Sequence, residues 1–220
     1  MMDMEASGLT TTIAKRLGWI LRGEETGADP LCDVPVRSTP EAVAIPTIGA
    51  IVPNWLLAVP RSCASCVAEL APGERLRLLR FSQQLANEMR DAGEPVFFEH
   101  GARESNHIVG CGVDQAHLHV LATRIDILAA ALADTEVTWT AVDTFDPWRH
   151  LDQSEYYFIQ AASKAFVGRP HTSQSQYFRK LIAQAAGVPL QWEYRVWPND
   201  ENVKLTYGRF NGRGAYAAEA

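Results

Sequence analysis

Two histidines separated by a single residue are the feature of this sequence best suited to chemistry. His117 and His119 stand in the segment GCGVDQAHLHVLA, residues 110–122. On a β-strand alternate side chains share a face, so Gln115 would lie beside the two imidazoles while the small and apolar residues between them face a core. A neutral imidazole is a nucleophile near physiological pH, because its unperturbed pKa is about 6.5. Such a pair can therefore do phosphoryl chemistry without a metal.

The glycines that precede the histidines favour anion binding. Gly110 and Gly112 flank Cys111 in a short loop. Glycine lets backbone N–H groups approach an anion closely, which suits a transition state whose charge spreads over phosphoryl oxygens. We therefore expect Cys111 and Gly112 to contact the substrate.

The histidine segment resembles the motif of the histidine-triad (HIT) family, His-φ-His-φ-His-φ-φ with φ hydrophobic. Residues 115–121 read Gln-Ala-His-Leu-His-Val-Leu, so Gln115 stands in place of the first histidine. The resemblance implies that His117 is the nucleophile and that His119 contacts the phosphate. Gln115 can donate and accept hydrogen bonds but cannot change its charge. In the family mechanism the nucleophile would attack an α-phosphorus and form a nucleotidyl-histidine, which water or another acceptor resolves.

Two further stretches carry the resemblance, which covers residues 41–124. Ile45–Arg61 resembles the strand-loop-strand of the family with its Pro-Gly-His turn, and Asn54 and Trp55 stand at the Gly-His positions. The segment FFEHG, residues 97–101, resembles bacterial HIT proteins and the related galactose-1-phosphate uridylyltransferases. The order of these elements supports the assignment of the histidine motif.

The remaining candidates for substrate binding lie in or near the segments that carry the resemblance. Thr47 stands where family members often have an Asn or Asp that contacts the ribose, and Trp55 would lie beside the pocket, where an aromatic ring could stack on a base. Glu99 and His100 close an apolar strand and are candidates for substrate contact. Asn106 lies in a loop where HIT proteins tend to supply polar phosphate contacts. For Glu99 and Asn106 a purely structural role is equally compatible with the sequence.

A metal site is the alternative reading of the two histidines. Histidines two apart on a strand could share one ion with a third ligand. That ligand would come from the preceding strand or loop, which contains Glu99, His100, His107 and Cys111. The HIT resemblance needs neither metal nor cofactor, and we expect none.

The order of the predicted strands and helices indicates an α+β fold. It would consist of an antiparallel sheet of about five strands with helices packed on it. Strands are expected at Glu41–Thr47, Asn54–Pro60, Pro95–Glu99 and Gln115–Thr123, followed by a hairpin of Glu155–Gln160 and Lys164–Gly168. Helices are expected at Thr10–Arg22, Pro72–Asp91 and Ile125–Ala133, and from Ser173 to about Gly187 with Gln176 completing a capping box. The tail after Ala186 has no clear periodicity.

This pattern divides the chain into three parts. Residues 1–40 form an N-terminal extension with a short amphipathic helix, residues 41–135 the HIT-like catalytic core, and residues 136–220 a C-terminal extension that packs on the core. Family members often form dimers, so we expect a homodimer.

Composition narrows the partners and the compartment. Of 220 residues, 47% are hydrophobic and 21% charged, which is ordinary for a globular protein. The net charge of −6 disfavours extended nucleic acid but not a mononucleotide, which a few local groups can bind. Asp3 and Glu5 stand where a secretory signal carries positive charge, and no apolar run could span a bilayer. A cytoplasmic protein without a membrane partner is expected. Its CxxC pair, Cys63 and Cys66, lacks the second pair of a structural zinc site.

The sequence thus predicts hydrolysis of a nucleoside phosphate at the α-phosphorus by His117, with a dinucleoside polyphosphate or a nucleotide conjugate as substrate. Nucleotidyl transfer or phosphorolysis is the alternative within enzymes, because the sequence does not fix the acceptor. A nucleotide-binding module without turnover is the alternative from another class, since Gln115 alters the triad.

Overall fold

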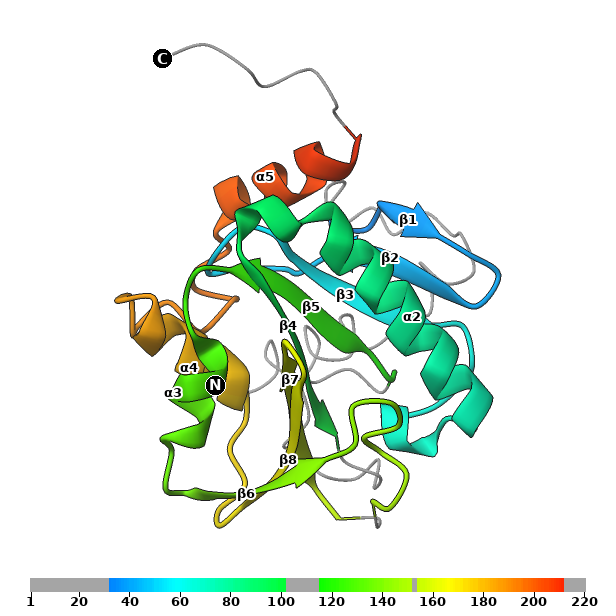
Figure 1. Ribbon diagram of the computed structural model, residues 1–220. Coiled ribbons are helices and arrows are strands. Elements are labelled where there is room, and N and C mark those ends of the chain that lie inside the picture. The colour runs from blue at the N-terminus through cyan, green and yellow to red at the C-terminus, as the bar shows by residue number, and fades with distance from the viewer. Residues whose placement is uncertain (1–31, 102–114, 152–153, 212–220) are drawn as a thin grey trace, which may run out of the picture.

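The computed structural model describes residues 32–101, 115–151 and 154–211, whose strands form one antiparallel sheet in the order β1-β2-β3-β5-β4-β7-β8-β6 (Figure 1). The strands are β1 Arg37–Ser38, β2 Ala42–Pro46, β3 Trp55–Pro60, β4 Glu94–Gly101, β5 Leu118–Thr123, β6 Val137–Val142, β7 Tyr156–Ala161 and β8 Lys164–Pro170. The helices are α2 Pro72–Glu88, α3 Ile127–Leu132, α4 Tyr177–Ala185 and α5 Asp200–Asn211, with 3-10 turns η1 Val67–Glu69 and η2 Arg90–Ala92.

The predicted α+β class is confirmed, but the predicted size of the sheet is wrong. Eight strands are present where about five were expected. The edge strand β6 was not predicted, because its side chains are mostly half-buried or exposed and the segment lacks a long apolar run. The predicted hairpin is confirmed as β7 and β8, and β7 also pairs with β4. The C-terminal strands therefore continue the sheet that carries the histidines.

The two faces of the sheet are buried in separate cores. One face packs under α2, where Leu56 and Val120 join Leu78 and Leu85 of the helix. The other face packs against α3 and α4, where Phe98 is among the buried residues. Alternation along each strand therefore decides which helices a side chain meets.

Helix α2 has clear start and stop signals. Pro72 occupies the first helical position, and the Glu74 carboxylate accepts from the Ala71 N–H at 2.9 Å. After the turn η2 the chain reverses at Gly93, which has φ of 147°. A Cβ at Gly93 would lie 2.2 Å from the Thr123 carbonyl carbon, so only glycine fits there.

The C-terminal helices differ from expectation. Helix α4 begins at Tyr177 rather than after Ser173, because the Ser173 hydroxyl donates to Glu155 and Gln176 takes a left-handed φ of 58°. The predicted capping box is therefore wrong. Helix α5 lies in the stretch that showed no periodicity, and the predicted helix Thr10–Arg22 lies outside the described residues.

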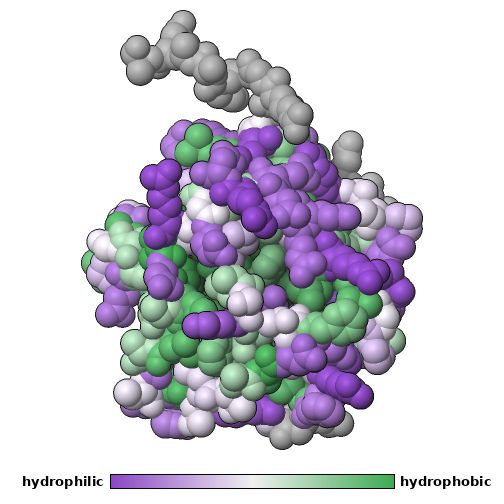
Figure 2. All heavy atoms as spheres, viewed as in Figure 1, coloured by the Kyte–Doolittle hydropathy of each residue, from purple (hydrophilic) through white to green (hydrophobic). Residues whose placement is uncertain are grey.

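The helices give the surface a mixed character. Hydrophilic residues gather over α5 and the neighbouring end of α2, whereas apolar residues gather over α3 and α4 (Figure 2). None of the described helices combines the length and the hydrophobicity needed to cross a membrane.

Candidate active site

The histidine segment enters the sheet later than its sequence suggests. The strand expected from Gln115 begins at Leu118, because the Ala116 N–H donates to the Ala64 carbonyl at 2.7 Å instead of to β3. The expected alternation is nevertheless present. Ala116 and Leu118 are buried in the core under α2. His119, on β5, points to the other face of the sheet, where it contacts Trp55 and Phe98.

His117 is oriented by the backbone. Its Nδ1 lies 2.9 Å from the carbonyl oxygen of Gln115. A carbonyl only accepts, so Nδ1 carries the proton and the neutral ring has its lone pair on Nε2. Burial lowers the pKa of His117, and nearby His100 lowers it further, although the Gln115 hydrogen bond acts in the opposite direction. The ring is thus held as a neutral nucleophile at Nε2.

His119 is held in the opposite tautomer. The indole N–H of Trp55 donates to its Nδ1 at 3.0 Å. An indole only donates, so Nδ1 is the acceptor and Nε2 carries the proton. The ring is 8% exposed and stacks on Phe98 with centroids 4.6 Å apart and planes within 8°. Burial, then the charges of His117 and Arg179, hold the pKa of His119 well below its usual value.

The two imidazoles therefore offer complementary groups. Their centroids are 5.0 Å apart with planes at 73°. His117 presents a lone pair and His119 an N–H, and both rings are neutral near pH 7. Such a pair can attack an electrophilic phosphorus and donate a hydrogen bond to one of its oxygens without a metal.

Gln115 positions the site through two of its groups. Its carbonyl holds His117, and its side-chain amide donates to the carbonyls of Pro60 and Ser62 at 3.1 and 2.9 Å. The amide therefore ties the end of β3 to the start of the histidine segment. In this arrangement Gln115 anchors the backbone that orients the nucleophile.

Trp55 supports His119 and has no face open to a base, because it is 0% exposed. It follows Asn54, which takes φ of 62°, a left-handed conformation that asparagine tolerates better than most residues. Helix α5 holds this turn: the Thr206 hydroxyl accepts from the Asn54 N–H at 2.8 Å, and Arg209 Nε donates to Asn54 Oδ1 at 2.7 Å. The expectation that Trp55 stacks on a base does not fit this placement.

Sequence reasoning missed the contribution of α5. The available signal was its charge pattern, with Asp200 and Glu201 in the first turn and Arg209 in the last, which suits the helix dipole. The pattern does not reveal that Thr206 faces the turn before Trp55. That contact joins residues 152 positions apart and needs the tertiary structure.

Thr47 lies on the side of the sheet that carries the histidines. It follows β2, and its N–H donates to the carbonyl of Trp55 at 3.1 Å. The side chain is 4% exposed, and its buried hydroxyl has no hydrogen-bond partner among the described residues. A buried hydroxyl without a partner costs free energy, so Thr47 remains a candidate for contact with a ligand.

Glu99 lies on the other face of the sheet and is not brought together with the histidines. Its Oε1 accepts from the Val67 N–H at 2.7 Å, and Oε2 accepts from Trp148 Nε1 at 2.9 Å and from the Tyr156 hydroxyl at 2.8 Å. Burial raises the pKa of Glu99 to about 7. A substrate contact from Glu99 does not fit this position, because strand alternation turns it away from the face of Phe98 and His119.

Three substrate-binding candidates lie outside the described residues, and the described residues contain no metal site. Asn106, Cys111 and Gly112, and His107 of the metal alternative, lie outside the described residues. Within residues 32–101, 115–151 and 154–211, no group of three or more His, Cys, Asp or Glu side chains could hold a metal ion. Cys63 and Cys66 are free thiols, and burial raises the pKa of Cys66 to about 11, so that side chain stays protonated.

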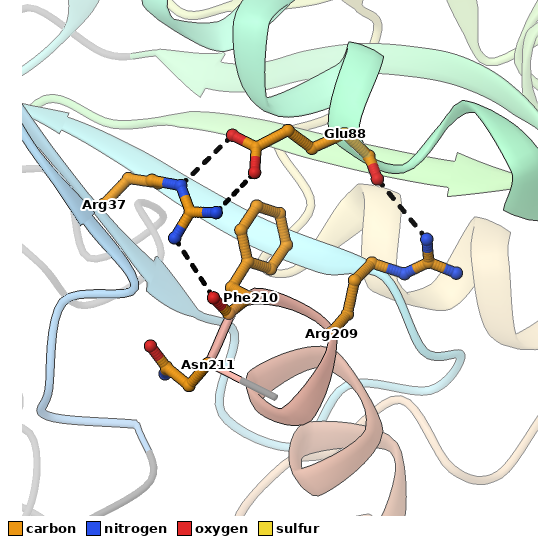
Figure 3. Close-up of a pocket in the computed structure, with 5 residues that line it drawn as sticks. All are labelled: Arg37, Glu88, Arg209, Phe210 and Asn211. Atoms are coloured by element: carbon orange, nitrogen blue, oxygen red, sulfur yellow. Dashed lines mark hydrogen bonds and ion pairs between the residues drawn. The ribbon is translucent and has the colours of Figure 1, made fainter. Parts of the chain in front are cut away.

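A surface hollow of about 520 Å³ lies away from the histidines, between β1, the end of α2 and the end of α5 (Figure 3). It is lined by Arg37, Glu88, Arg209, Phe210 and Asn211. Arg37 pairs with Glu88, and Arg209 donates to Asp91 at 2.6 Å and to the Glu88 carbonyl at 3.3 Å. The first contact joins β1 to α2, the others fasten α5 to the end of α2 and to η2, and we assign the hollow no catalytic role.

Comparison with known proteins gives only distant similarity. The chain matches no family model, and no curated protein matches its sequence. Among solved structures, it is similar to a DUF4931 family protein from Bacillus cereus ATCC 10987, with 9% identity and a TM-score of 0.42 over 81% of this chain and 100% of the other. It is also similar to yeast Ap4A phosphorylase Apa2, with 10% identity and a TM-score of 0.41 over 81% of this chain and 76% of the other. At TM-scores below 0.5 these similarities decide neither fold nor function.

Proposed function

We propose that this protein is a HIT-type enzyme that cleaves or transfers a nucleoside phosphate at the α-phosphorus, with His117 as the nucleophile. One observation carries the proposal: neighbouring histidines are held in opposite tautomers by partners that can only accept or only donate. A structural pair of histidines would not need one free lone pair beside one free N–H. A nucleophile and a hydrogen-bond donor at one phosphorus need both.

The proposed reaction has two steps. The Nε2 lone pair of His117 forms a bond to the α-phosphorus while the bond to the leaving oxygen breaks, and that oxygen departs with the electron pair. The Nε2–H of His119 donates to an oxygen of the reacting phosphate and stabilises the charge that develops there. In the second step the oxygen of water, or of another acceptor, attacks the phosphorus and the P–N bond breaks. The pair returns to His117, and the acceptor loses a proton to solvent.

The nucleoside is proposed to bind on the same face of the sheet. The unpartnered Thr47 hydroxyl lies there, at the end of β2. A hydroxyl that lacks a partner on this face can form a hydrogen bond with the sugar of the nucleoside.

Intact-protein mass spectrometry tests the proposal directly. Wild type, His117→Ala and His117→Gly would be incubated with adenosine and guanosine phosphoramidates and with dinucleoside polyphosphates, in the presence of chelator. We expect a nucleotidyl adduct or product release in wild type and neither in the two variants. His150→Gln, which changes an exposed histidine, is the matched control and should behave as wild type.

The outcomes separate the alternatives. Release of the free nucleoside monophosphate would identify water as the acceptor, whereas product that appears only with added phosphate or alcohol would identify a transferase. Nucleotide binding without an adduct or turnover in wild type would overturn the enzymatic proposal in favour of a binding module. Activity that disappears with chelator would point to a metal site.

A further inference from the structure

A third histidine lies beside the pair described above. His100 is on β4, two residues after Phe98, which pairs with His119 of β5. Continuing this antiparallel register by two residues places His100 opposite His117. Because alternate residues share a face, His100 lies on the same face as Phe98 and not on that of Glu99. The electrostatic influence of His100 reaches both His117 and His119.

His100 is held rigidly by its surroundings. Its Nε2 lies 2.5 Å from Glu155 Oε1, and its side chain is 3% exposed. The ring meets Tyr157 edge to face, with centroids 4.7 Å apart and planes at 89°. The Ser173 hydroxyl donates to the other oxygen of Glu155, so the carboxylate is itself fixed. This carboxylate fixes the orientation of the ring through Nε2.

One atom of this ring has no partner. The Nδ1 of His100 is buried and makes no hydrogen bond within the part of the chain that the structure describes. An unsatisfied buried polar atom costs free energy, so its retention next to His117 needs a reason. An anion that arrives with the substrate would supply the missing acceptor.

We propose that His100 is a further catalytic residue, which donates Nδ1–H to a non-bridging oxygen of the phosphoryl group that His117 attacks. The inference rests on the proposed function and adds a second donor to it. Gln115 uses its amide to tie down the backbone, whereas His100 is oriented by Glu155 at Nε2 and keeps Nδ1 for the phosphate. This hydrogen bond changes neither the bonds that form and break nor the proton balance of the reaction.

The competing explanation is structural, because the pair of His100 and Glu155 also joins β4 to the start of β7. A structural role would slow the reaction of every substrate alike. A hydrogen bond to one non-bridging oxygen is stereospecific, because replacing that oxygen by sulfur weakens the bond while replacing the other does not. The two diastereomers of an α-thio nucleotide therefore distinguish the two roles.

The experiment compares the labelling of His117 by the separated diastereomers of α-thio adenosine triphosphate and α-thio guanosine triphosphate. For normal nucleotides we expect His100→Gln to slow labelling by about a hundredfold. The preference of wild type for one diastereomer should fall by about tenfold in this variant, since the contact that distinguishes them is gone. Glu155→Gln should reduce both quantities by smaller factors. His150→Gln should leave them unchanged.

Each outcome decides something. If His100→Gln slows both diastereomers by the same factor, or leaves labelling unchanged, the inference is overturned while the function of His117 stands. If wild type is not labelled by these probes or by any nucleotide of the wider panel, the proposed function itself fails. If His100→Gln shows no cooperative thermal transition, Glu155→Gln provides the test, and an unchanged diastereomer ratio in that variant overturns the inference.

Discussion

At the scale of single residues, the site depends on hydrogen-bond partners that can only accept or only donate. A carbonyl fixes the proton of His117 on Nδ1, and an indole fixes that of His119 on Nε2. Both assignments follow from the chemistry of the partner. Changing a partner should therefore change catalysis even though the histidines remain in place.

Trp55→Phe tests this dependence. The variant keeps an aromatic ring but removes the N–H that donates to His119 Nδ1, so the ring can adopt the other tautomer and lose its Nε2–H. We expect the rate of nucleotidylation to fall about tenfold, because the lost hydrogen bond is worth roughly 1.5 kcal/mol. Nucleotide affinity, measured by calorimetry, should change much less. A rate equal to that of wild type would show that Trp55 does not set the tautomer.

The pH dependence of His117 is a second prediction at this scale. Burial lowers the pKa of His117 below its ordinary value of 6.5, so the imidazole stays unprotonated to lower pH than a free histidine. Single-turnover labelling should therefore be constant around neutral pH and decline only below about pH 6.5. A midpoint above 6.5 for the acidic limb would contradict a buried, neutral nucleophile.

At the scale of elements, α5 holds the turn that presents Trp55. Thr206 is 0% exposed, and its hydroxyl both accepts from the Asn54 N–H and donates to the Asn202 carbonyl at 2.8 Å. The left-handed turn at Asn54 thus depends on a helix that begins 146 residues later in the chain (200 against 54). Stability and alignment of the site are coupled at this point.

Thr206→Val removes the hydroxyl with little change in shape and leaves the Asn54 N–H without its partner. We expect the free energy of unfolding in urea to fall by about 1–3 kcal/mol, the cost of an unsatisfied buried donor. The matched control is Thr140→Val on the exposed side of β6, which should stay within about 0.5 kcal/mol of wild type. Equal effects of the two substitutions would argue against the support of the Asn54 turn by Thr206.

At the scale of the whole molecule, the sheet separates two polar networks. The histidines lie on one face, whereas Glu99 with Trp148 and Tyr156 lies in the core under α2. Strand alternation alone places neighbours in β4 on opposite faces. The Glu99 network therefore bears on global stability, and the histidine network bears on the proposed chemistry.

The stability of the whole protein should consequently depend on the protonation of Glu99. Its pKa is raised from 4.5 to about 7 by burial, so the folded state holds a proton that the unfolded state has lost. Stability from this group is fully present below about pH 4.5 and is lost as the pH rises through about 7, by roughly 3 kcal/mol in total. Glu99→Gln lacks this titration and serves as the reference.

Urea unfolding of both proteins from about pH 5 to about pH 8 measures the effect. The amide introduced by Glu99→Gln would place its own N–H donors against one of the three groups that now donate to the carboxyl, so the variant should be less stable at the acidic end of this range. The difference in the free energy of unfolding should narrow as the pH rises. Only the wild-type protein must then either bury an ionised Glu99 carboxylate or take up a proton in order to fold. A difference that is constant or widens with pH would show that Glu99 is already ionised in the folded protein at the acidic end.

The sequence by itself determined the local features of this protein. The alternation of Gln115 to Val120, the proline start of α2 and the hairpin of β7 and β8 follow from short-range periodicity and backbone stereochemistry, and the structure confirms them. Only the tertiary structure decided the size of the sheet, the face of Glu99, the support of Asn54 by α5 and the pairing of Phe98 with His119. These features depend on register and on contacts between distant segments. Side-chain periodicity specifies a face within one strand but not which strand or helix lies next to it.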